Sequence, residues 1–67
     1  MSISARAQET RLLLEATIDL VSARQIGKLK ATTILESAIH FANQNDEVWR
    51  YIGPETEILD AMIEDMD

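Results

Sequence analysis

The chain has 67 residues, a formal net charge of −6 at pH 7 and no cysteine. This length allows one domain with a small core, and the absence of cysteine excludes disulfides and thiolate metal sites. Because so short a chain buries little apolar surface by itself, we expect a homodimer whose two copies share their cores.

Charge divides the chain into two parts. Residues 1–44 carry five basic and four acidic side chains, whereas residues 45–67 carry one basic and eight acidic ones. We therefore predict one domain, 1–67, made of a dimerising helical hairpin (1–44) and an acidic C-terminal segment (45–67). The acidic residues either face a partner with a basic surface or form a solvated face that keeps the protein dissolved.

Residues 1–7 permit two interpretations. Their alternation would suit a strand, in which Ser2, Ser4 and Arg6 share one side. Alternatively, Ser2 or Ser4 is the N-cap of the following helix. The poor strand propensity of alanine at positions 5 and 7 favours the cap.

Residues 8–24 have a helical pattern with a wide apolar arc, which suits burial against two neighbours. We expect this helix to stop before Gly27, acting as the residue just past the helix end. Arg24, Lys28 and Lys30 then gather at the turn. They either attract an anion or complement the C-terminal dipole of the helix.

Residues 30–43 predict a second amphipathic helix, with Thr33 and Glu36 spaced as a capping box. Alanines in the middle of its apolar arc would let another helix approach closely. We predict a dimer interface drawn from both helices, formed by Leu13, Thr17, Leu20, Ala31, Leu35, Ala38 and Ala42.

The C-terminal segment predicts two further helices. Residues 47–52 suit a short third helix that Gly53 terminates, and Pro54 suits the first position of an acidic amphipathic helix. The predicted fold class is therefore all-α: a small helical hairpin with a short third helix and an acidic C-terminal helix, forming an intertwined homodimer.

The sequence offers little catalytic chemistry. His40 has Ser37 and Glu36 one turn before it, but an exposed helix face lacks the enclosed pocket that catalysis needs. We interpret these residues as a surface pair and predict no enzyme, no metal and no cofactor. Charged residues interrupt every apolar run, so we predict a cytoplasmic protein without a membrane partner.

Residue types that anchor protein interfaces lie next to the acidic helix. Trp49, Arg50 and Tyr51 are such types, although Trp49 equally suits closure of the small core. We predict a partner-binding site at Trp49, Arg50, Tyr51, Glu57, Asp60 and Glu64. The function that follows is inhibition of another protein, a transcription regulator, enzyme or toxin, through its basic surface.

Two resemblances bear on this function. Residues 2–7, 13–16 and 32–38 (SISARA, LLEA and TTILESA) resemble the strand and two helices of ribbon-helix-helix antitoxins over residues 2–43. That resemblance implies a DNA-binding repressor or antitoxin, with Ser2, Ser4 and Arg6 reading bases and an acidic segment neutralising a toxin. In size, acidity and helicity the chain is also similar to small phage-encoded anti-activators of quorum sensing.

Overall fold

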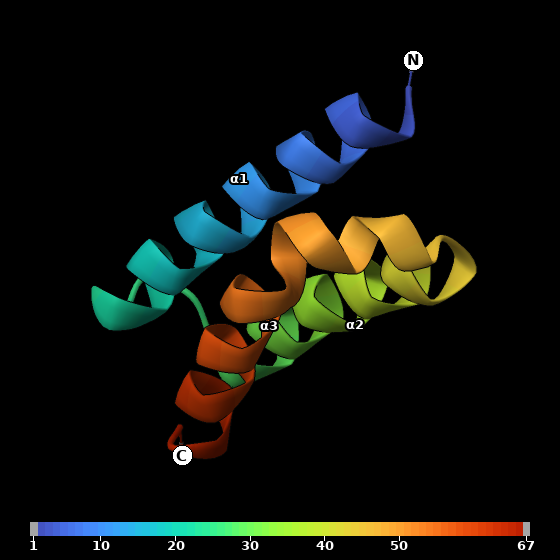
Figure 1. Cartoon of the computed structure of the whole chain (residues 1–67). Coiled ribbons are helices and arrows are strands. Elements are labelled where there is room, and N and C mark those ends of the chain that lie inside the picture. Colours follow the sequence, from blue (N-terminus) through green and yellow to red (C-terminus); the bar gives the residue numbers. More distant parts are fainter. Residues whose placement is uncertain (1, 67) are drawn as a thin grey trace.

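Three helices account for most of the chain in the computed structural model, which describes residues 2–66 (Figure 1). They are α1 (Ile3–Ser22), α2 (Lys28–Gln44) and α3 (Trp49–Glu64), and a 3₁₀ turn, η1 (Asp46–Val48), precedes α3. The predicted all-α class is confirmed, and residues 2–66 contain no strand. α1 and α2 form an antiparallel hairpin, and α3 packs against both helices, more extensively against α1.

α1 begins earlier than the sequence pattern indicates. The Ser2 hydroxyl accepts a hydrogen bond from the Ala5 amide at 3.2 Å, which caps the first turn. The N-cap interpretation of residues 1–7 is therefore confirmed for Ser2, and the strand interpretation is wrong for the described residues. Met1 lies outside the described residues.

The α1–α2 turn differs from the prediction at its glycine. Arg24, not Gly27, is the residue past the helix end, and it has a positive φ of 58°. The Gln25 amide donates to the Leu20 carbonyl at 2.8 Å and the Arg24 amide to the Val21 carbonyl at 3.1 Å. These two bonds form a Schellman motif, which satisfies the last carbonyls of α1.

Gly27 instead serves as the N-cap of α2, with φ −85° and no side-chain cap. The predicted Thr33–Glu36 capping box is wrong, because Thr33 lies inside the helix. Its hydroxyl donates to the Leu29 carbonyl at 3.0 Å. α2 thus begins at Lys28 without any side-chain hydrogen bond at its N-cap.

The core lies where the three helices meet. α2 contributes three fully or almost fully buried alanines, which allow the close helix approach predicted from the sequence. The buried hydroxyls of Thr17 and Thr56 donate to the Leu13 and Gly53 carbonyls, each at 2.7 Å. The buried apolar residues are Ala7, Leu14, Val21, Ala31, Leu35, Ala38, Ala42, Val48, Ile52, Leu59 and Ile63.

α3 continues through the predicted break at Gly53 and Pro54. The expected separate third and fourth helices are therefore one helix, Trp49–Glu64. Glycine has no Cβ to clash with the proline ring, and Pro54 is exposed to solvent, so the missing hydrogen bond lies away from the core. Figure 1 shows that α3 changes direction along its length, as expected for a helix with an internal proline.

We predict that Arg24→Gly stabilises the fold. A left-handed conformation costs a non-glycine residue about 1 kcal/mol, so this variant should raise the free energy of unfolding by about that amount. Urea denaturation measures the change. Arg24→Ala, which removes the charge but keeps the Cβ, is the control and should show no such gain.

A second prediction distinguishes the leucines of α1 and α2. Leu14 is fully buried, whereas Leu29 is 82% exposed. Leu14→Ala should lower the free energy of unfolding by about 2 to 5 kcal/mol, because it leaves a cavity. Leu29→Ala should change it by less than about 0.5 kcal/mol in the same denaturation measurement. Equal effects of the two variants would contradict the packing described here.

Candidate functional site

The outward face of α3 is acidic. Glu57, Asp60 and Glu64 are all exposed, and their spacing of three and four residues places them on one face of the helix. Ile52 and Leu59 are fully buried against the other helices, which fixes the rotation of α3 about its axis. The carboxylates therefore point to solvent from a helix that is held in place by the core.

The three residues at the start of α3 do not form one patch with this face. Trp49 and Tyr51 are half-buried and pack against the core, whereas Arg50 is exposed. Residues two positions apart on a helix are rotated by about 200°, so the two aromatic side chains leave the helix in different directions. Of the predicted partner-binding residues, Arg50 and the three carboxylates are the exposed ones, and Arg50 lies seven residues before Glu57 on the same side.

Most residues predicted for the dimer interface lie inside a single chain. Two members remain accessible, Leu13 at 51% exposure and Leu20 at 42%. The other five are buried by the chain's own helices: Thr17, Ala31, Leu35, Ala38 and Ala42. In this fold those five pack within one copy, and a second copy can reach only Leu13 and Leu20 without opening the core.

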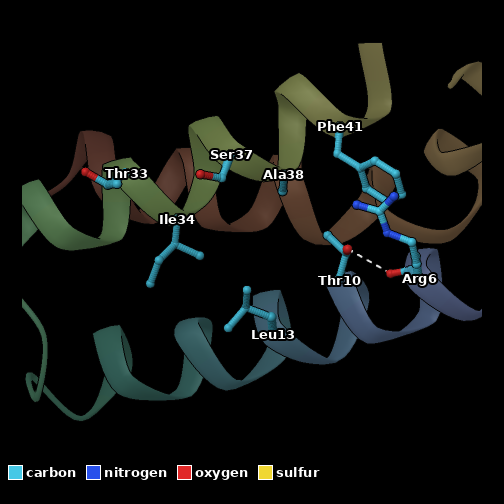
Figure 2. Close-up of a pocket in the computed structure, with 8 residues that line it drawn as sticks. All are labelled: Arg6, Thr10, Leu13, Thr33, Ile34, Ser37, Ala38 and Phe41. Carbon is cyan, nitrogen blue, oxygen red and sulfur yellow. Dashed lines mark hydrogen bonds between the residues drawn. The ribbon is translucent and has the colours of Figure 1, made fainter. Parts of the chain in front are cut away.

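A groove of about 310 Å³ runs between α1 and α2 (Figure 2). Figure 2 shows Leu13 of α1 and Ile34 of α2 pointing towards each other across it. At one end the Arg6 guanidinium carbon lies 4.6 Å from the centroid of the Phe41 ring, a cation–π distance. The complete lining is Arg6, Thr10, Leu13, Thr33, Ile34, Ser37, Ala38 and Phe41.

This groove was not predicted from the sequence, although the pairing of residues across the helical hairpin could have indicated it. In an antiparallel helix pair, residues at matching distances from the turn lie opposite each other. Arg6 with Phe41 and Leu13 with Ile34 are two such pairs, separated by 35 and 21 positions, and all four residues line the groove. Placing the turn correctly would therefore have predicted the arginine–aromatic contact.

The residues predicted to read DNA lie in or next to a helix. Ser2 caps α1, Ser4 lies in its first turn with its hydroxyl 3.2 Å from that of Ser2, and Arg6 covers Phe41. A ribbon-helix-helix protein would need a strand here, and residues 3–22 are helical. The DNA-binding alternative therefore has no strand to support it in the part of the chain described.

The remaining polar candidates, the histidine and the basic residues of the turn, lie at the surface. His40 is exposed, and its Nε2 atom lies 3.2 Å from Nε2 of Gln44 rather than in an enclosed pocket. Among residues 2–66, no three histidine, aspartate or glutamate side chains gather as metal ligands. Arg24 and Lys28 line a pocket of about 390 Å³ that also contains Asp65, and Lys30 is not part of it.

Comparison of the chain with protein-family models, curated proteins and solved structures gives no match. The two resemblances noted in the sequence thus remain predictions. None of the helices in the described part of the chain has both the length and the apolarity needed to cross a membrane.

We predict a measurable coupling between Arg6 and Phe41. A double-mutant cycle with Arg6→Ala and Phe41→Ala, read by thermal or urea denaturation, should give an interaction free energy of about 0.5 to 1 kcal/mol. The value is modest because Arg6 is exposed to solvent. Strictly additive effects of the two substitutions would show that the contact contributes nothing to stability.

Proposed function

We propose that this protein is a small acidic regulator that binds another protein and inhibits it by covering a basic surface. The observation that carries this proposal is the acidic face of α3, formed by Glu57, Asp60 and Glu64. The inhibited protein would be a transcription regulator, an enzyme or a toxin, and the contact would take place in the cytoplasm.

The packing of α3 into the core supports this role. Its inner face is anchored by Ile52, Leu59 and Ile63 in the core, so binding would not require the acidic face to become ordered first. Negative surfaces of this kind accelerate encounters with basic partners and select against acidic ones. Ile58, which is 50% exposed on the same helix, offers apolar area beside the charges.

We further propose that the active form is a homodimer. This part of the proposal rests on the limited core of a single chain and on large apolar side chains of α1 that stay exposed. A dimer would present two acidic faces, which would strengthen binding to a partner that is itself dimeric.

The acidic face is tested by charge reversal with a matched control. Asp60→Lys with Glu64→Lys should abolish recovery of the bound protein in affinity capture from nuclease-treated lysate of the source cells. Glu15→Lys with Asp19→Lys changes the net charge equally on the exposed side of α1 and should leave recovery unchanged. Recovery with the wild-type chain should fall as salt is raised, because exposed charge pairs are screened.

Several outcomes would contradict the proposal. Equal loss of the captured protein with both double variants would show that net charge, not the acidic face of α3, controls binding. Undiminished recovery with Asp60→Lys and Glu64→Lys would show that this face is not the binding site. Circular dichroism and thermal melting of each variant show whether the helices are intact. Recovery that disappears on nuclease treatment would favour nucleic acid as the partner.

A further inference from the structure

The groove between α1 and α2 has an apolar middle and a single charged side chain. Leu13 and Ile34 face each other across it, and Ala38 and Phe41 continue the apolar lining along α2. Arg6 is the one charged residue among the eight described residues that line the groove. The groove therefore offers a ligand an apolar surface that ends at a positive charge (Figure 2).

The Phe41 ring holds the Arg6 guanidinium at the end of the groove. The guanidinium carbon lies 4.6 Å from the ring centroid, where the face of the ring attracts the cation. Arg6 is exposed, so a ligand can reach its N–H groups without displacing another part of the chain. A guanidinium that is already held in place loses less conformational entropy when it binds a carboxylate through two parallel hydrogen bonds.

The threonine hydroxyls of the groove are already used as donors. The Thr10 hydroxyl donates to the Arg6 carbonyl at 2.8 Å, and the Thr33 hydroxyl donates to the Leu29 carbonyl at 3.0 Å. Because a hydroxyl has a single proton, neither threonine can donate to a ligand at the same time. Of the described lining residues, Arg6 and Ser37 are therefore the ones whose side chains can donate to an anion.

The distribution of charge along the chain permits an anion at this place. Residues 1–44, which contain both walls of the groove, carry five basic and four acidic side chains, and the excess of carboxylates lies in residues 45–67. A cationic ligand would meet Arg6 with like charge. The lining is thus complementary to a molecule with one negative end and an apolar body.

The dimensions of the groove limit the length of that body. Its volume of about 310 Å³ lies at the small end of the range for ligand sites. Arg6 and Leu13 are seven positions apart on α1, which corresponds to about 10 Å along the helix axis. An extended alkyl chain of about eight carbon atoms has a similar length, because each C–C bond is about 1.5 Å long.

We propose that the groove binds a small amphipathic carboxylate, a medium-chain monocarboxylic acid in its ionised form. Its carboxylate accepts hydrogen bonds from the Arg6 guanidinium, and its apolar chain lies between Leu13 and Ile34. This site goes beyond the inhibitory function proposed above and shares no residue with the acidic face of α3, so the two can be tested separately.

The first test uses octanoate as the probe, added to the isotope-labelled full chain and followed in amide NMR spectra. Octanoate should shift the signals of the lining residues on both helices and should saturate with a dissociation constant of about 1 mM or below. Octylammonium has the same apolar chain with the opposite charge, and acetate has the charge without the chain. Each should bind at least about 10-fold more weakly than octanoate.

The second test uses two matched pairs of variants. Arg6→Gln should weaken octanoate binding by about 10-fold, because it removes charge-assisted hydrogen bonds. Arg11→Gln, on an exposed arginine of α1 that does not line the groove, should leave the affinity unchanged. Leu13→Gln should also weaken binding by about 10-fold, and Leu29→Gln, on an exposed leucine outside the groove, is its control. Circular dichroism shows whether each variant keeps its helices.

Three outcomes would overturn the proposal. Octanoate could fail to saturate the folded chain at about 10 mM, which is too weak for a built site. Equal affinity for octanoate and octylammonium, or signal shifts spread over the whole chain, would show non-specific association with apolar surface. Unchanged affinity in Arg6→Gln, or an equal loss in Arg11→Gln, would show that Arg6 does not hold the carboxylate.

Discussion

The fold depends on the burial of α3 in the angle between α1 and α2. Ile52 and Leu59 are completely buried there, and the buried alanines of α2 are small enough to let another helix approach closely. Without α3, the apolar faces of α1 and α2 would be exposed to water. A chain of this length has little other apolar surface to bury. The return of α3 along both helices therefore completes the core of each copy.

The same burial decides which side chains remain available at the surface. Because Ile52 and Leu59 face inward, Glu57, Asp60 and Glu64 must face outward. On α1, burial of Leu14 likewise directs its two preceding neighbours, Leu12 and Leu13, towards the outside. The acidic surface and the exposed leucines are thus two consequences of one packing arrangement.

The helices and the buried side of α2 could be predicted from the sequence because both depend on local periodicity. Ala31, Ala38 and Ala42 recur at helical spacing and are buried, as expected. The buried side of α1 could not be fixed in this way, since its apolar arc is wider than one neighbour covers. Only the position of α3 shows that Leu14 enters the core and that Leu13 and Leu20 do not.

The ends of the helices were harder to predict, for reasons specific to each residue. Glycine is the usual residue past a helix end, yet Arg24 adopts the left-handed conformation and Gly27 caps the next helix. Gly53 and Pro54 together usually end a helix, but tertiary packing on both sides holds α3 continuous. The predicted site was affected in turn, because Trp49 and Tyr51 are half-buried against the core, whereas the carboxylates of the same helix are exposed.

The apolar arc of α1 is wider than the surface that the rest of its own chain covers. The three-helix core covers one flank of the α1 arc and leaves Leu13 and Leu20 at the other flank. About half of each of these side chains is exposed to solvent, although Leu13 also faces Ile34 across the groove. In the proposed homodimer, a contact outside the chain would cover the exposed part of these side chains. Association through α1 would supply the apolar burial that this core lacks, while α3 would keep its carboxylates free for a different partner.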